Sequence, residues 1–227
     1  MERFSSIEAV DRLMEGYYGS LEYKISDSKI TPCILIGEVH GDPENIGLQI
    51  KLTESYKPDV ILLETLGNFS YTGGSNRLNL PPDRVTSDNS RRIRERIFFN
   101  PESEDSIYEW KKLADSKGLL LIGCDLSVEE LVSQLKKEKM IDEDDLPSWS
   151  ELVFMSVAKQ QRESRMKKLF VRYQSEGKKV LMVVGYGHAK QLFQSAEVTN
   201  IAFAFTKGKD YEEISYELKI IIPENKD

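Results

Sequence analysis

Four short, uninterrupted apolar runs constrain the possible folds of this chain most strongly. They occupy residues 33–36, 60–63, 119–122 and 180–184, and each ends at a glycine or a carboxylate. An apolar run of this length, closed by such residues, is typical of a strand that is buried on both faces of a parallel sheet. The runs therefore predict an α/β fold with a central mixed, largely parallel sheet flanked by helices.

Helical and strand patterns also occur outside these runs. Residues 5–18 have apolar side chains at helical spacing, which predicts an amphipathic helix over the sheet or its edge. Pro43 is suited to the first position of a helix after the first run, and residues 150–175 form a long polar helix candidate before the fourth. The tail 199–222 reads as two strands around a polar turn, which predicts a C-terminal antiparallel strand pair.

The length and the composition favour one domain. A chain of 227 residues with 40% hydrophobic content is long enough to form a single α/β domain over residues 1–227. Residues 67–103 interrupt the alternation of strands and helices, because Gly73-Gly74 and Pro81-Pro82 stand in a polar stretch without periodicity. We expect a long loop excursion there, which is either a lid over a site or a surface loop.

Charge and hydropathy exclude several classes of function. A net charge of −7 disfavours a phosphate-binding surface, so we expect no nucleic-acid partner. The sequence has no apolar stretch of membrane-spanning length and no signal-peptide pattern in its first residues, so we expect no membrane span and a cytoplasmic location. Cys33 and Cys124 lie in apolar runs and are expected to be buried thiols. The oligomeric state is not indicated.

Both histidines of the chain end a G-x-x-H tetrad that directly follows an apolar run. The tetrads are GEVH at 37–40 and GYGH at 185–188. Parallel strands bring their carboxyl ends to one edge of the sheet, where open α/β sheets bind ligands, so His40 and His188 are expected to share a site. Glu38 and Glu64 also stand at strand ends. Asp125 does too, although an aspartate after a strand is equally suited to capping the next helix.

Two chemical routes are open to these residues. Two imidazoles and a carboxylate are a common ligand set for a divalent ion, so His40, His188 and Glu38 are candidate ligands for Zn, Mn or Co, which would activate water. Without a metal, His40 would take a proton from water while a carboxylate fixes its tautomer and a cation stabilises the oxyanion. Both routes lead to hydrolysis.

Five short motifs, taken in order, resemble a known superfamily. They are GEVHG at 37–41, LLET at 62–65, CDL at 124–126, RESRM at 162–166 and VVGYGH at 183–188. Together they resemble the superfamily that joins TraB/PrgY pheromone-shutdown proteins, Tiki metalloproteases, erythromycin esterases and the haem-binding lipoprotein ChaN. The resemblance spans roughly residues 33 to 205 and implies an α/β fold with a central mixed sheet.

The resemblance also implies a set of site residues. The positions that correspond to the superfamily's pocket are Glu38, His40, Glu64, Arg162 and His188. In the Tiki branch the two histidines are associated with metal, and in the esterase branch the histidine matching His40 is taken as a general base. Glu163 stands where the family usually has Asp or Asn, so the resemblance does not indicate which substrate this chain would take.

We therefore expect a hydrolase that acts on an ester, lactone or amide of a small-molecule or peptide substrate. His40 and His188 would serve as bases or ligands, Glu38 and Glu64 as ligands or orienting groups, and Arg162 as the cation that stabilises the anion. The alternative is a ChaN-like protein that holds haem or another flat ligand at the same edge without turnover. A third alternative is a catalytically silent interaction module.

Overall fold

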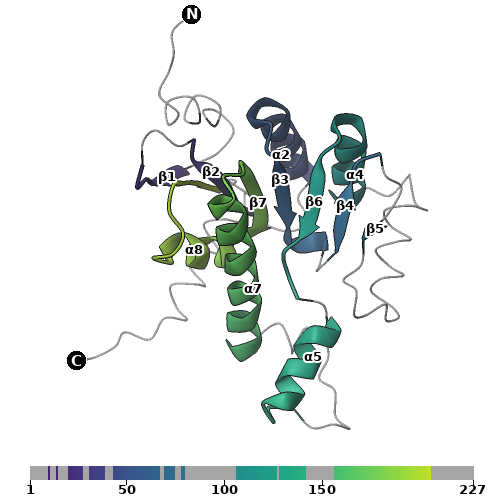
Figure 1. The fold of residues 1–227 in the computed structure, drawn as a ribbon, viewed down its shortest axis with the longest axis vertical. Helices are drawn as coiled ribbons and strands as arrows, with labels where there is room; N and C mark the ends of the chain where they lie inside the picture. Colours follow the sequence, from purple (N-terminus) through teal and green to yellow (C-terminus); the bar gives the residue numbers. More distant parts are fainter. Residues whose placement is uncertain are drawn as a thin grey trace, which may run out of the picture.

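The fold is built around one eight-stranded sheet, shown in Figure 1. In this computed structural model the described residues are 10, 14, 20–27, 31–38, 43–66, 69–74, 78–79, 106–126, 128–141 and 156–205. The strands are β1 (Ser20–Lys24), β2 (Cys33–Glu38), β3 (Val60–Leu63), β4 (Ser70–Thr72), β5 (Leu78–Asn79), β6 (Leu120–Gly123), β7 (Val180–Gly185) and β8 (Ile201–Phe205). The helices are α2 (Pro43–Tyr56), the 3-10 helix η1 (Glu64–Leu66), α4 (Ser106–Lys117), α5 (Val128–Lys137), α7 (Ser156–Ser175) and α8 (Tyr186–Gln194).

The centre of the sheet is parallel and its two edges are antiparallel. The strand order is β1-β8-β2-β7-β3-β6-β4-β5. Strand β2 pairs in parallel with β7 and β8, and β3 pairs in parallel with β6 and β7. The antiparallel pairs are β1 with β8, β4 with β6 and β4 with β5. The four apolar runs form neighbouring strands, so the predicted mixed, largely parallel α/β sheet is confirmed.

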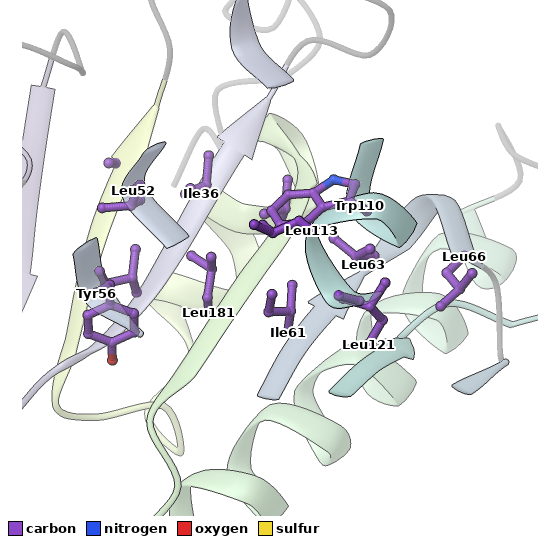
Figure 2. Close-up of a cluster of buried hydrophobic side chains, with 14 of the residues drawn as sticks. Ile36, Leu52, Tyr56, Ile61, Leu63, Leu66, Trp110, Leu113, Leu121 and Leu181 are labelled. Atoms are coloured by element: carbon purple, nitrogen blue, oxygen red, sulfur yellow. The ribbon is translucent and has the colours of Figure 1, made fainter. Parts of the chain in front are cut away.

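Two layers of helices bury the two faces of this sheet. Side chains of successive strand residues point to opposite faces, so Ile61 and Leu63 pack with α2 and α4, whereas Val60 and Leu62 pack with α7 and α8. Figure 2 shows the first cluster, in which Leu52 and Tyr56 of α2 and Trp110 and Leu113 of α4 lie over the sheet. Burial on both faces explains why the four apolar runs lack the alternation of apolar and polar residues.

Short elements refine the predictions outside the central strands. Val10 and Met14 are helical and buried, as expected of the helix predicted at 5–18, whose other residues lie outside the described part. The excursion expected at 67–103 contains β4 and β5, which extend the sheet beyond β6, and residues 80–105 lie outside the described part.

The C-terminal strand pair is described only in its first half. Its first strand forms as β8, but the antiparallel partner of β8 among the described residues is β1, from the N-terminal side. Residues 206–227, which include the expected second strand, lie outside the described part. Within the described ranges, no helix combines the length and the apolar character that crossing a membrane requires.

Gly37 allows α8 to pack tightly on β2. A Cβ atom at Gly37 would lie 3.1 Å from the Cα of Tyr186 and 3.2 Å from the Cβ of Ala189. Such distances are too short for the neighbouring atoms to stay in place, so a side chain here would push α8 away from the sheet. Since α8 carries His188 in its first turn, Gly37 helps to fix the height of that imidazole above the strand ends.

Candidate functional site

The order of the central strands brings the predicted motifs to one edge of the sheet. Along β2-β7-β3-β6, the residues at the carboxyl ends are Glu38, Gly185, Glu64 and Cys124-Asp125. Glu38 stands opposite Gly185 in the register of β2 and β7, and Leu63 stands opposite both Val183 and Gly123. The motifs that are far apart in the chain are therefore neighbours at the carboxyl edge.

Arg162 of α7 connects two of these strand ends. Its Nε donates to both carboxylate oxygens of Asp125, at 2.9 and 3.0 Å, and its Nη2 donates to Asp125 Oδ2 and to Glu64 Oε1, each at 2.7 Å. The other oxygen of Glu64 accepts the backbone N–H of Gly185 at 2.7 Å. Glu64 is thus held at both oxygens, by the helix on one side and by β7 on the other.

This cluster is buried, which shifts the pKa values of several of its members. Burial raises the pKa of Asp125 and the charge of Glu64 adds to this rise, while the bonds from Arg162 act against it. For Arg162, burial acts to lower the pKa, but the bonds to Asp125 and the charges of both carboxylates outweigh it and raise the pKa. Burial also raises the pKa of the Cys124 thiol, and Glu64 and Asp125 add to it. The guanidinium is therefore firmly charged between its two carboxyl groups.

His188 lies between two carboxylates from different elements. Its Nδ1 is 3.2 Å from Oε1 of Glu163 on α7, and its Nε2 is 3.7 Å from Oε1 of Glu64. The side chain of His188 is 12% exposed, so the ring is largely shielded but reachable. Two adjacent residues of α7 contact different parts of the site. Arg162 contacts Glu64 and Asp125, and Glu163 contacts His188.

Glu38 points to the other side of the same edge. Gly37 faces α8, so the next residue faces the opposite layer, and there Glu38 accepts a hydrogen bond from Nε2 of Gln49 on α2. The structure therefore brings Glu64, Arg162 and His188 together with Asp125 and Glu163. It holds Glu38 apart from them, on the α2 side.

The expected metal ligands are not gathered by the described residues. His40 lies outside the described part of the chain, and the other two expected ligands, His188 and Glu38, point to different sides of the sheet edge. Within the described residues, no group of three His, Cys, Asp or Glu side chains is arranged to hold a metal ion. This geometry does not fit a site built on His188 and Glu38.

Sequence reasoning left three of the polar partners without a role. Asp125 was balanced between a site residue and a helix cap, and it does accept the N–H of Leu126 at 2.7 Å in addition to the bonds from Arg162. Glu163 stood only as a departure from the family pattern. Gln49 belongs to none of the motifs, and its one sequence signal is that it is a polar residue at a core-facing position of α2.

Comparison with known proteins gives one distant structural likeness. No protein-family model and no curated protein matches the chain. A solved structure titled "Cofacial heme binding to ChaN of Campylobacter jejuni" matches 78% of this chain and 88% of that chain, with 14% sequence identity and a TM-score of 0.37. A likeness at this level carries no functional argument, and membership of the superfamily named above remains a prediction.

Proposed function

We propose that the carboxyl edge is a hydrolytic site for an ester, lactone or amide, with His188 as the general base. The observation that carries this proposal is the position of the His188 ring between Glu163 and Glu64. A carboxylate at Nδ1 is the usual means of fixing the tautomer of a catalytic histidine, because it accepts the Nδ1–H and leaves the lone pair on Nε2.

The gap between His188 and Glu64 suits a water molecule. At 3.7 Å, the distance from His188 Nε2 to Glu64 Oε1 is too long for a direct hydrogen bond, and a bridging water can contact both atoms. In the proposed reaction, Nε2 takes a proton from this water as the water oxygen attacks the substrate carbonyl carbon. The two carboxylates stabilise the imidazolium that forms, and the imidazolium then returns the proton to the leaving group.

The contacts of Arg162 support a positioning role. From the sequence, this guanidinium is expected to stabilise the anion that develops on the substrate. Its Nε and Nη2 instead donate to Asp125 and Glu64, and these two carboxylates outnumber its single positive charge. We propose that Arg162 fixes Glu64 beside His188, so that the carboxylate orients the attacking water.

The experiment is a hydrolase panel of p-nitrophenyl esters, lactones and peptide amides, assayed with wild type, His188→Gln and Lys190→Gln. Removing a general base costs about 100-fold or more in kcat, so His188→Gln is expected to lose at least that much on any active substrate. Lys190 is exposed on the same helix and serves as the matched control, with activity close to wild type. Equal activity in all three proteins would overturn the proposal.

A parallel titration with haemin tests the ligand-binding alternative. A saturable Soret shift that His188→Gln abolishes, together with a silent panel, would replace the hydrolase proposal with haem binding without turnover.

A further inference from the structure

Asp125, which follows strand β6, takes up most of the hydrogen bonds of Arg162. It accepts from Nε at both carboxylate oxygens, at 2.9 and 3.0 Å, and from Nη2 at 2.7 Å. Glu64 accepts a bond from the same Nη2, also at 2.7 Å. The side chains of Arg162 and Asp125 are 5% and 6% exposed, so their contact is shielded from solvent. Asp125 therefore orients the guanidinium, and Glu64 meets the guanidinium in that orientation.

Capping of the next helix does not account for this aspartate. A cap residue accepts backbone N–H groups from the first turn of its helix, and α5 begins at Val128. Among the described residues, the backbone N–H that Asp125 accepts is that of Leu126, at 2.7 Å, which precedes the helix. The carboxylate is directed across the strand ends to Arg162 on α7. The structure thus resolves the two roles that the CDL motif left open in favour of the site.

Stability alone does not account for a charged pair at this position. Two buried charges lose their hydration, and well-packed apolar residues of the same volume are often equally stabilising. A bidentate pair does confer a fixed geometry, because the planar guanidinium matches the two oxygens of a carboxylate. Orientation is therefore what the contact between Asp125 and Arg162 contributes to its surroundings.

The orientation of Arg162 reaches the proposed reaction through Glu64. The Oε1 of Glu64 that accepts the Nη2–H of Arg162 is the same oxygen that lies 3.7 Å from His188 Nε2. The other oxygen of Glu64 is held by the backbone N–H of Gly185 at 2.7 Å. A turn of the guanidinium would therefore move Oε1 relative to Nε2, and with it the place where the attacking water contacts both atoms.

We propose that Asp125 is a positioning residue of the hydrolytic site and holds Glu64 in place through Arg162, an inference that rests on the proposed function. In this role Asp125 touches neither the water nor the substrate. The water oxygen still bonds to the carbonyl carbon, and its proton still passes to His188 Nε2, so Asp125 transfers no proton and no electrons. Its contribution is to keep the orienting carboxylate at a fixed distance from the base.

The test measures kcat and KM of Asp125→Asn on a p-nitrophenyl ester that the wild type hydrolyses. Asparagine keeps the size of the side chain and an oxygen for the N–H of Leu126, but its amide nitrogen offers Arg162 a donor in place of the second acceptor. We expect kcat to fall about 10- to 100-fold with KM close to the wild-type value. Asp115→Asn is the matched control and should keep kcat near wild type, because Asp115 pairs with Lys111 on α4, at the other face of the sheet.

A double-mutant cycle tests whether Asp125 acts through Arg162. If it does, adding Asp125→Asn to Arg162→Met should lower kcat further by less than about twofold, because the guanidinium that Asp125 orients is already gone. Each variant is assayed below its melting temperature, so that a loss of folded protein is not counted as a loss of kcat.

Distinct outcomes separate this inference from the proposed function. A kcat of Asp125→Asn equal to that of wild type would overturn the role of Asp125 and leave the hydrolase standing. Losses in the two single variants that multiply in the double variant would do the same. If Asp125→Asn does not fold, Asp125→Ser, whose hydroxyl is an acceptor for the N–H of Leu126, carries the same kcat comparison. A wild type that is silent on the whole panel would remove the proposed function, and this inference with it.

Discussion

Arg162 lies between two carboxyl groups that are buried together in the protein interior. Its fork fits Asp125 on one side and reaches Glu64 on the other, and all three side chains are at most 9% exposed. A buried ion pair adds little stability when compared with apolar residues of the same volume, but the loss of one partner leaves an uncompensated buried charge. The cluster is therefore sensitive to the removal of its only described cation.

We predict that Arg162→Met lowers the free energy of unfolding by about 3–5 kcal/mol, measured by urea denaturation. Arg165→Met, one helical turn further on, is the matched control and is expected to cost about 1 kcal/mol. Nε of Arg165 is buried without a hydrogen-bond partner, so its replacement breaks no hydrogen bond of that atom. If Arg165 proves to be the more sensitive position, the alignment of the RESRM motif with the superfamily is wrong.

At the scale of elements, the site depends on how closely α8 approaches β2. A Cβ at Gly37 would be in tight contact with the Cα of Tyr186, so the start of α8 would have to shift by a few tenths of an ångström. Gly47 of α2 is a useful contrast, because a Cβ added there would meet no atom within 4 Å.

We predict opposite effects of the two alanine substitutions on thermal stability. Gly37→Ala should lower the free energy of unfolding by about 1–3 kcal/mol through overpacking, and should reduce turnover by shifting His188. Gly47→Ala should raise the free energy by about 0.5–1 kcal/mol, because alanine favours a helix over glycine at an exposed position. Calorimetry on the two purified variants measures both, and a Gly37→Ala protein as stable and as active as wild type would contradict the packing argument.

Sequence patterns predicted the elements that carry a strong hydrophobic signal and missed those that do not. The buried strands β2, β3, β6 and β7 were found within one or two residues of their bounds, because apolar burial on both faces dictates their composition. Strand β1 has the mixed sequence SLEYK, and β4 is three residues long, so neither has a pattern that stands out from a loop. Both are held by pairing with strands distant in the chain.

The site was predicted as a location but not as a set of contacts. The rule that parallel strands end at one edge brings Glu64 and His188 together. Side chains alternate between the two faces of the sheet along a strand, so the position of a residue in its strand decides which helices it faces. This alternation turns Glu38 toward α2 and Glu64 toward α7. The contacts of Arg162 and Glu163 depend on how α7 is rotated over the sheet. Tertiary packing decides this rotation, and short sequence motifs do not predict it.

For the whole molecule, a general-base site and a metal site make different demands on the two histidines. The general-base proposal uses His188 with Glu163 and Glu64, which lie 3.2 and 3.7 Å from the two ring nitrogens. A metal site would instead need both His40 and His188 as ligands, with loss of either ligand reducing the bound metal. The two mechanisms therefore differ in a property of the intact protein that does not depend on knowing its substrate.

We predict that dialysis of the full chain against a chelator leaves its turnover and its melting temperature unchanged. Elemental analysis of wild type, His40→Ala and His188→Ala, each incubated with Zn, Mn or Co and then desalted, should find equal and substoichiometric metal in all three. Near-stoichiometric metal in wild type that either substitution removes would show that the histidines share an ion, and metal-activated water would then replace His188 as the source of the nucleophile. Because Glu38 is bonded to Gln49 on the far side of the edge, Glu38→Gln is expected to leave the metal content unaltered in either case.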